Sequence, residues 1–294
     1  MRLAKDRAQV RVPATSANLG PGFDAFGLAL SIWDDVRVEA VAGPSEAHVQ
    51  GEGAGSLPGG EDHLIIRALR VALDYVDAPQ AGFVLHCHNR IPHGRGLGSS
   101  AAAAVAGLLL ARGLISEPEA LTDDCLLTLA TEFEGHPDNA APAIFGGATI
   151  AYVSEGAARA AKIPVSGIAP TVIVPVAELS TSRSRGALPS YVPHDDAAFN
   201  SSRSGLLALA LSGQPELLFA ATEDRLHQNY RADVMPETAE LLAQLRANGI
   251  PAVVSGAGPS VLVLGELPYS AEEQVPRGWR VLRSAIAEQG AHLA

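Results

Sequence analysis

The stretch that decides the fold is Pro92-His93-Gly94-Arg95-Gly96-Leu97-Gly98-Ser99-Ser100. It follows the strand-like run Phe83 to Cys87 and leads into the alanine-rich run 101–105, which is typical of a helix. Glycines at alternate positions leave the backbone N–H groups uncovered, and the two serines lie where the helix begins. Because the first N–H groups of a helix are unpaired and carry the positive end of its dipole, this loop suits a phosphate group.

Two other phosphate-binding patterns do not fit this stretch. A Walker A loop needs Lys followed by Ser or Thr after its last glycine, and a dinucleotide fingerprint needs a third glycine at a spacing that is absent here. The remaining alternative is a glycine-serine turn with an ordinary capped helix behind it. The stretch alone favours phosphate binding, but it does not exclude the alternative of a plain turn.

The length and composition of the chain indicate two domains with a sizeable core. The 294 residues exceed the usual size of one domain, and hydrophobic residues make up 47% of them. Strands precede helices in each half, which favours an α+β layout. The small and polar stretch 154–170 is where we place the crossing, so we predict domains over 1–155 and 156–294.

The charge and cysteine content exclude several classes of protein. A formal net charge of −11 argues against a surface for nucleic acid or for an anionic membrane. Two cysteines without a CxxC pattern indicate a reducing compartment. The N-terminal ten residues lack an apolar run, and the longest apolar stretch, 101–111, is too short to cross a bilayer. We therefore expect a cytoplasmic protein.

The hydrophobic periodicity and the turn residues predict the other elements. Strands are predicted over 10–12, 27–32, 36–41, 83–87, 144–150, 171–176, 252–255 and 261–264, with Pro13 ending the first and Asp34-Asp35 forming a hairpin turn between the second and third. Helices are predicted over 62–76, 99–113, 117–133, 206–211, 215–230, 236–247 and 280–289.

The loop 92–100 is called the phosphate loop below. A dense group of polar side chains lies at the end of the predicted helix 117–133, in Glu132-Phe133-Glu134-Gly135-His136-Pro137-Asp138-Asn139. Pro137 and Pro142 prevent a regular helix there. Because a plain loop rarely needs so many functional groups, we predict a metal site or an acid–base cluster. His86 and His88 share one face of a strand, and without a third ligand nearby we expect a solvated sheet face.

Two further groups of side chains are candidates for ligand contacts. Asn18 and Asp24, in the glycine-rich turn after the first strand, either face a ligand or bond only to their own turn. The run Leu179 to Arg185 combines hydroxyl and guanidinium groups, which suit an anion, with solvated arginines as the alternative.

Three stretches together resemble the GHMP kinase superfamily. Val12 to Asp24 is similar to its first motif, Pro92 to Ala103 to its phosphate loop, and Ser255 to Ser260 to its third, glycine-rich motif. Their order and spacing cover almost the whole chain, which makes the match more specific than any single loop. Glu134 to Pro142 is similar to the branch that acts on L-homoserine. The resemblance implies an α+β, two-domain fold with an N-terminal ribosomal-protein-S5-like nucleotide-binding domain and a C-terminal ferredoxin-like domain.

The activity implied is ATP-dependent phosphorylation of the side-chain hydroxyl of L-homoserine to O-phospho-L-homoserine, a step of threonine biosynthesis. The phosphates of ATP would contact Pro92, His93, Gly94, Arg95, Gly96, Leu97, Gly98, Ser99 and Ser100. Ser100 and Glu134 would lie near Mg²⁺. His63 stands in an adenine-binding position where relatives often carry Asn.

The same resemblance implies a site for a zwitterionic amino acid. Asp24 would receive the ammonium group, and Arg185 and Arg231 would bind the carboxylate, beside Thr181 and Gly258. The hydroxyl would be surrounded by Asn18, His136, Asp138 and Asn139. Several superfamily kinases have an aspartate base where this chain has Asn139, which cannot accept a proton. Positioning and the charge of Mg²⁺ would then carry catalysis, with the proton passing to Asp138 or to a phosphate oxygen.

Three alternative functions follow from the same residues. One is a GHMP kinase for another small hydroxylated metabolite such as mevalonate, which has a carboxylate but no ammonium group for Asp24. The second is a catalytically silent nucleotide sensor on the same fold, and the third an acidic interaction module whose glycines only form turns. The sequence does not give the oligomeric state, and a homodimer is carried as a hypothesis.

Overall fold

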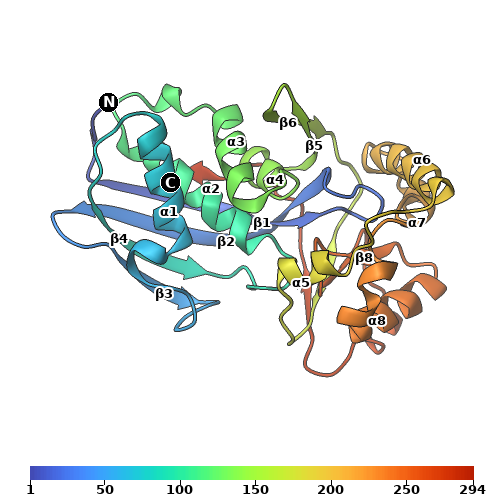
Figure 1. Ribbon diagram of the computed structural model, residues 1–294. Coiled ribbons are helices and arrows are strands. Elements are labelled where there is room, and N and C mark those ends of the chain that lie inside the picture. Colours follow the sequence, from blue (N-terminus) through green and yellow to red (C-terminus); the bar gives the residue numbers. More distant parts are fainter.

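The larger of two β-sheets is built mostly from the N-terminal half of the chain in this computed structural model, which describes residues 1–294 (Figure 1). Its seven strands follow the order β11-β1-β2-β4-β3, with β5 added to β2 and β6 to β5. Every pairing is antiparallel except that of β3 with β4. The bounds are β1 (Arg7–Ala17), β2 (Phe26–Val41), β3 (Glu46–Gly51), β4 (Gly82–Asn89), β5 (Ala148–Ser154), β6 (Ala157–Ile163) and β11 (His292–Leu293).

Four helices pack together over this sheet (Figure 1). They are α1 (Leu64–Tyr75), α2 (Ser99–Leu114), α3 (Asp123–Glu134) and α4 (Ala140–Phe145), with the 3-10 turns η1 (Gly60–Asp62) and η2 (Pro118–Ala120). Helix α2 is buried on almost all sides, which its small alanine side chains permit. Gly107 lets α1 come close, because a Cβ there would lie 2.3 Å from the carbonyl oxygen of Ile65. This packing fixes the N-terminus of α2, where the phosphate loop ends.

A second sheet has four antiparallel strands in the order β10-β7-β9-β8. The bounds are β7 (Thr171–Val174), β8 (Ala252–Val254), β9 (Val261–Val263) and β10 (Arg280–Arg283). The helices of this half are α5 (Thr181–Gly186), α6 (His194–Leu211), α7 (Leu218–Ala221), α8 (Pro236–Ala247) and α9 (Tyr269–Glu272), with the 3-10 turns η3 (Pro215–Leu217) and η4 (Asn229–Val234). Both sheets being mainly antiparallel, the fold is the α+β class that the sequence predicts. No helix is at once long and apolar enough to span a membrane.

The passage between the two sheets lies inside the predicted crossing stretch 154–170, toward its end. Strand β6 pairs with β5 and so belongs to the larger sheet, and β11 returns to pair with β1. We therefore propose that the first domain comprises residues 1–163 and the C-terminal strand, with the crossing between Ile163 and Thr171. The boundary predicted after residue 155 falls inside the β5–β6 hairpin.

The prediction of a hairpin turn at Asp34-Asp35 is wrong. Strand β2 runs through both aspartates without a turn, and β1 likewise continues through Pro13, where its register against β2 shifts by a bulge. Asp34 is buried, and its Oδ1 accepts hydrogen bonds from the backbone N–H groups of Arg90 (2.6 Å) and Ile91 (2.9 Å), which offset the cost of burial. The carboxylate therefore anchors the segment that enters the phosphate loop.

Several predicted helices and strands have other bounds or another type. The predicted helix 280–289 is wrong, because residues 280–283 form β10 and pair with β7. The predicted helix 215–230 is broken after α7, and helix 206–211 is only the end of α6. Residues 117–122 precede α3 as a 3-10 turn and its cap, and residues 144–145 belong to α4 rather than to β5. Residues 280–283 show the cause most clearly, because a short apolar run can have the same pattern in a helix and in a strand.

The buried Asp34 predicts an unusual dependence of stability on pH. Burial raises the pKa of Asp34 to about 6, although its backbone hydrogen bonds and Arg90 lower it. A carboxyl whose folded pKa lies above its unfolded value stabilises the fold at low pH, and this stability is lost as the pH rises through about 6. Asp34→Asn keeps the accepting oxygen and is therefore expected to stabilise the protein at pH 8, by up to about 3 kcal/mol, and to have no such effect below pH 4.

Chemical denaturation of both proteins between pH 4 and pH 8 measures this difference. Asp35→Asn is the neighbouring control, because hydrogen bonds from Arg90 and Arg11 outweigh burial and lower the pKa of Asp35. Its substitution should destabilise the protein above pH 4. An Asp34→Asn protein that is less stable than the wild type by the same amount at every pH would contradict the assignment.

Candidate active site

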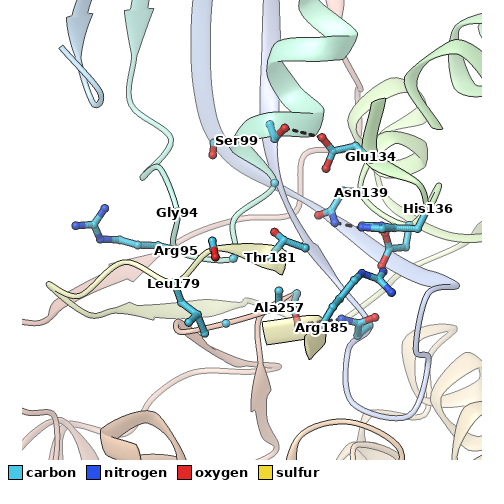
Figure 2. Close-up of a pocket in the computed structure, with 18 of the residues that line it drawn as sticks. Gly94, Arg95, Ser99, Glu134, His136, Asn139, Leu179, Thr181, Arg185 and Ala257 are labelled. Carbon is cyan, nitrogen blue, oxygen red and sulfur yellow. Dashed lines mark hydrogen bonds and ion pairs between the residues drawn. The ribbon is translucent and has the colours of Figure 1, made fainter. Parts of the chain in front are cut away.

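A cavity of about 150 Å³ lies where the phosphate loop, the turn after β1, helix α5 and the β8–β9 turn meet (Figure 2). Its walls come from both halves of the chain. The cavity brings together most of the residues singled out from the sequence: Asn18, Asp24, Gly94, Arg95, Gly96, Gly98, Ser99, Ser100, Glu134, His136, Asp138, Asn139, Thr181, Arg185, Arg231 and Gly258. Pro92 and Leu97 are instead buried in the surrounding core.

The phosphate loop presents bare backbone to this cavity. Gly94, Gly96 and Gly98 all have φ between +63° and +70°, a conformation that favours glycine. Space also requires it, since a Cβ on Gly96 would lie 2.2 Å from the carbonyl oxygen of Ser255, and one on Gly98 would lie 1.9 Å from the hydroxyl of Thr15. Helix α2 begins directly after Gly98, so its unpaired N–H groups and positive dipole end point at the cavity.

Arg95 does not turn its charge toward the cavity. Figure 2 shows its side chain extending away from the other labelled groups. The guanidinium donates to the carbonyl oxygens of Pro175 (3.0 Å), Val176 (2.7 Å) and His93 (2.7 Å). Arg95 therefore joins the phosphate loop to the segment between β7 and α5, and only its backbone remains available to a phosphate.

Ser100 and Glu134 form a site of hard oxygen ligands at the N-terminus of α2. The Ser100 hydroxyl donates to Oε1 of Glu134 at 2.5 Å, and a dashed line in Figure 2 joins the start of α2 to Glu134 at the end of α3. A carboxylate beside a hydroxyl at a phosphate-binding helix end fits the oxygen ligands that Mg²⁺ prefers. Glu132 is exposed and lies outside the cavity.

The loop between α3 and α4 contributes a chain of buried hydrogen bonds. Nδ1 of His136 pairs with Oδ1 of Asp138, and Nδ2 of Asn139 donates to the same oxygen at 3.4 Å. The Thr15 hydroxyl donates to Oδ1 of Asn139 at 2.8 Å. Burial alone would lower the pKa of His136, but the hydrogen bond and charge of Asp138 outweigh it and raise the pKa. The sequence does not single out Thr15, although it lies in the first motif. Its role becomes visible only through its contact with Asn139, which lies on another element.

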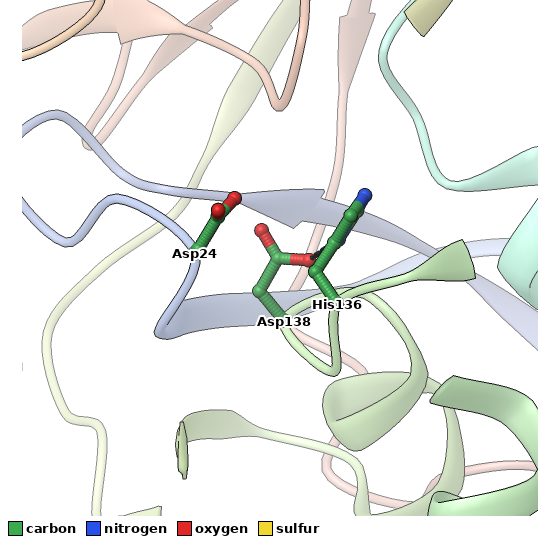
Figure 3. Close-up of side chains that lie close together, drawn as sticks. All are labelled: Asp24, His136 and Asp138. Atoms are coloured by element: carbon green, nitrogen blue, oxygen red, sulfur yellow. Dashed lines mark hydrogen bonds and ion pairs between the residues drawn. The ribbon is translucent and has the colours of Figure 1, made fainter. Parts of the chain in front are cut away.

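Three ionisable side chains converge on one point of the cavity (Figure 3). Asp24, His136 and Asp138 each offer one ligand atom, and these atoms lie within 4.8 Å of one another. Oδ2 of Asp138 makes no hydrogen bond within the protein, while its Oδ1 is occupied by His136 and Asn139. Such a cluster attracts a cation, which an ammonium group or a metal ion supplies.

Asp24 and Arg185 pair with each other across the cavity. Nη2 of Arg185 donates to Oδ1 of Asp24 at 2.6 Å and Nη1 to Oδ2 at 3.1 Å, a bidentate pair. Both side chains are 35% exposed. The side chains expected to bind opposite ends of a zwitterion are therefore in contact with each other.

Arg231 has the opposite character, because it is almost wholly buried. It is 1% exposed, and its Nη1 donates to Nδ1 of His227 (2.9 Å) and to the carbonyl oxygen of Gly256 (3.2 Å). Its Nε and Nη2 make no hydrogen bond within the protein. Burial, then the charge of Arg185, lower the pKa of Arg231 to about 10, so it is charged at neutral pH. The Nε–Nη2 edge is therefore left for an anionic ligand.

Asn18 builds the turn that carries Asp24. Its Oδ1 accepts from the backbone N–H of Asp24 and its Nδ2 donates to the carbonyl oxygen of Gly256, both at 2.9 Å. The sequence leaves open whether Asn18 bonds only to its own turn. Its amide bonds to that turn and also to the β8–β9 turn, so it joins the two. Both polar atoms of the amide are thus engaged within the protein.

A second cavity, of about 420 Å³, adjoins the first at Ser99 and Ser100. Its lining is mostly apolar and includes Phe133, His63 and His93. His63 is 4% exposed, its Nδ1 accepts from the backbone of Ile65, and its Nε2 has no partner. Burial, then the charge of His93, lower the pKa of His63, so a neutral ring presents an N–H donor here.

His86 and His88 lie on the exposed face of β4, where His86 stacks on His48 with ring centroids 5.1 Å apart. No third ligand group joins them, because the cavity cluster of Asp24, His136 and Asp138 is the one group of potential ligands in the chain. Both side chains are exposed, as the prediction of a solvated sheet face requires.

Comparisons with known proteins agree with one another. The model of the GHMP kinases N terminal domain matches residues 63–147, and that of the GHMP kinases C terminal matches residues 204–280. A homoserine kinase of Clavibacter michiganensis subsp. michiganensis is 52% identical, over 97% of this chain and 93% of that protein. One of Streptomyces coelicolor is 50% identical, over 96% and 93%. The crystal structure of homoserine kinase from Cytophaga hutchinsonii is 25% identical, with a TM-score of 0.85 over 99% of this chain and 98% of that one.

Proposed function

The chain belongs to the homoserine kinases of the GHMP kinase superfamily, and from this premise we propose which side chains bind and position its substrates. Its activity is that of a homoserine kinase, the transfer of a phosphoryl group from ATP to the side-chain hydroxyl of L-homoserine. One observation carries the assignment of the site. Arg231, whose Nε and Nη2 have no hydrogen-bond partner in the protein, and the bare N-terminus of α2 line the same cavity.

The carboxylate of homoserine binds the Nε–Nη2 edge of Arg231. A buried charged donor without a partner is costly, and a carboxylate supplies two parallel hydrogen bonds to that edge. The ammonium group binds Asp24, within reach of Oδ2 of Asp138. Because Asp24 pairs with Arg185, an ammonium group bound to Asp24 frees Arg185, which then binds the carboxylate as its second donor.

The nucleotide occupies both cavities. Its phosphates lie along Gly94, Gly96 and Gly98 against the N-terminus of α2, and its base enters the apolar second cavity. There the Nε2–H of His63 donates to an acceptor nitrogen of adenine, which satisfies the unpartnered ring atom. Ser100 and Glu134 would hold Mg²⁺, which would supply positive charge beside the phosphoryl oxygens.

The hydroxyl of homoserine is positioned by the loop between α3 and α4. Asn139 cannot accept a proton, so it acts by orientation, and Oδ2 of Asp138 accepts the hydroxyl hydrogen bond. His136 holds Asp138 in place through its Nδ1. A loose phosphoryl-transfer transition state requires alignment of the hydroxyl more than early removal of its proton.

Thr15→Val tests the orientation of Asn139. The substitution preserves shape but removes the donor to Oδ1 of Asn139, so the amide loses its fixed rotation. We expect kcat to fall roughly tenfold, with the KM for both substrates unchanged. Thr15→Ser keeps the hydroxyl and should retain most of the activity. A Thr15→Val enzyme with unchanged kcat would remove Asn139 from the machinery.

The proposed contacts are tested together by ADP release with a panel of alcohols. Homoserine has both charged groups, 3-aminopropan-1-ol lacks the carboxylate, 4-hydroxybutyrate lacks the ammonium group, and mevalonate is the superfamily alternative. We expect homoserine to have by far the highest kcat/KM, and each single-charge analogue to be poor. Equal turnover of homoserine and 4-hydroxybutyrate would remove Asp24 from its assigned role, and ATP binding without turnover of homoserine would favour the silent sensor.

We also propose that the enzyme works in the reducing cytoplasm, where the unpaired thiols of Cys87 and Cys125 persist. The homodimer stays a prediction, which light scattering after size-exclusion chromatography measures.

A further inference from the structure

His227 lies fully buried between the Asp24-bearing turn and Arg231. Its Nε2 donates to the carbonyl oxygen of Gly20 at 2.8 Å, and its Nδ1 accepts from Nη1 of Arg231 at 2.9 Å. Its ring is 5.3 Å from that of Phe23, with the planes inclined by 30°. One imidazole thus touches both walls that we assign to the two charged ends of the substrate.

The hydrogen bonds of His227 fix its tautomer. Because a carbonyl oxygen only accepts and a guanidinium only donates, the proton lies on Nε2 and the ring is neutral. Asp224 lies 3.7 Å from Nε2, but its oxygens accept from the backbone N–H groups of residues 226, 227 and 228. Burial, opposed by the charge of Asp224 and assisted by that of Arg231, lowers the pKa of His227, which agrees with the neutral ring.

The guanidinium of Arg231 needs such an anchor. It is held at one nitrogen only, Nη1, by His227 and by the carbonyl oxygen of Gly256. Without the imidazole acceptor only the carbonyl oxygen of Gly256, at 3.2 Å, would hold the group, and the charges of Asp24 and Asp138 would draw it toward them. Its Nε–Nη2 edge would then no longer be presented to a substrate carboxylate in one fixed direction.

We propose that His227 is a positioning residue that sets specificity for an α-amino acid. Through Nδ1 it directs the Nε–Nη2 edge of Arg231 at the carboxylate, and through Nε2 and Gly20 it fixes that edge relative to Asp24. The inference rests on the proposed role of Arg231 in carboxylate binding. The two ring nitrogens have different functions in this proposal. Nδ1 acts through Arg231 on the carboxylate, and Nε2 acts through Gly20 on the site of the ammonium group.

Two substitutions separate the functions of the ring nitrogens. The amide of Asn reaches the position of Nδ1, so His227→Asn keeps an acceptor for Arg231 and loses the bond to Gly20. The amide of Gln reaches the position of Nε2, so His227→Gln keeps the bond to Gly20 and loses the acceptor. Homoserine and 3-aminopropan-1-ol are the two substrates, since the second has no carboxylate for Arg231.

His227→Gln should raise the KM for homoserine roughly 10- to 30-fold and leave kcat, the KM for ATP and turnover of 3-aminopropan-1-ol unchanged. The preference for homoserine, measured as the ratio of the two kcat/KM values, should fall by the same factor. His227→Asn should raise the KM for both alcohols together and leave that ratio unchanged. If His227 were only structural, each variant would instead lose activity with both alcohols to the same extent and would unfold at a lower temperature.

Equal losses with both alcohols in His227→Gln would overturn the inference, as would a ratio that falls in His227→Asn. If His227→Gln does not fold, His227→Ala takes its place: it also removes the acceptor for Arg231, so the ratio should fall, and an unchanged ratio would overturn the inference. Arg231→Ala is measured beside them. Loss of homoserine preference in Arg231→Ala without any loss in His227→Gln refutes the positioning role alone, whereas an unchanged ratio in Arg231→Ala refutes the assigned carboxylate site itself.

Discussion

Replacing Arg231 with alanine is expected to raise the KM for homoserine about 100-fold while leaving the KM for ATP nearly unchanged. The guanidinium is almost wholly buried and its Nε–Nη2 edge has no partner in the protein. Removing one side of a buried, hydrogen-bonded charge pair costs about 2–5 kcal/mol, which corresponds to roughly 30- to 4,000-fold in affinity. Initial rates with each substrate varied in turn give both KM values.

Two neighbouring substitutions give this prediction its scale. Arg231→Lys keeps a positive charge but lacks the parallel donors, so we expect an intermediate KM. Arg185→Ala should raise the KM for homoserine less, because Arg185 is partly exposed and must first leave Asp24. Equal rises in the KM for homoserine and for ATP in Arg231→Ala would contradict the role of Arg231. Thermal unfolding of each variant separates loss of binding from loss of the fold.

The pair formed by Asp24 and Arg185 bears on selectivity in its own right. In the proposed binding mode a zwitterion replaces both partners at once, since its ammonium group binds Asp24 and its carboxylate binds Arg185. A ligand with only one charged group breaks the pair and leaves one member unpaired in a partly desolvated cavity, which is unfavourable. We therefore expect the internal ion pair to disfavour simple hydroxy acids and amino alcohols without any steric barrier.

The residues that meet in the cavity could largely be predicted from the sequence, because three motifs of strong local character carry them. Glycines with positive φ at 94, 96 and 98 and the helix start at Ser99 depend on local backbone rules. The glutamate at the end of α3 was likewise visible as part of a dense polar run. What the motifs do not contain is the direction of each side chain.

Residues whose role depends on distant partners were missed or misread. Arg95 sits inside the phosphate loop yet bonds to the segment after β7, some 80 residues later. Asp34 looks like a turn residue because the amides that it accepts from are 56 and 57 positions away. His227 was read as part of a helix, although its spacing of four residues before Arg231 was a signal for a contact.

Errors in secondary structure have the same origin. Residues 280–289 have an amphipathic helical pattern, but strand β7 offers an open edge and residues 280–283 pair with it as β10. The β2 strand continues through Asp34 because tertiary hydrogen bonds compensate the buried carboxylate. Tertiary context overrides local propensity at these places, which single-sequence reasoning does not detect.

Replacing Glu134 with glutamine is expected to lower kcat at least 100-fold and to raise the Mg²⁺ concentration needed for half-maximal rate. Glutamine keeps the shape and an oxygen that accepts from the Ser100 hydroxyl, so the change removes the charge and little else. A divalent cation supplies several kcal/mol of charge stabilisation in phosphoryl transfer, and each 1.4 kcal/mol is about tenfold in rate.

Titration of Mg²⁺ at saturating ATP and homoserine distinguishes this role from a structural one. If Glu134 holds the cation, excess Mg²⁺ should restore part of the lost rate, whereas the KM for homoserine stays near that of the wild type because no group at the carboxylate site has changed. Glu132→Gln is the matched control, since Glu132 lies two residues earlier, exposed and outside the cavity, and its substitution should leave kcat and the Mg²⁺ requirement unchanged. An active Glu134→Gln enzyme beside an inactive Glu132→Gln enzyme would instead make Glu132 the ligand of the cation. The last turn of α3 would then have to face the phosphates with Glu132 rather than with Glu134.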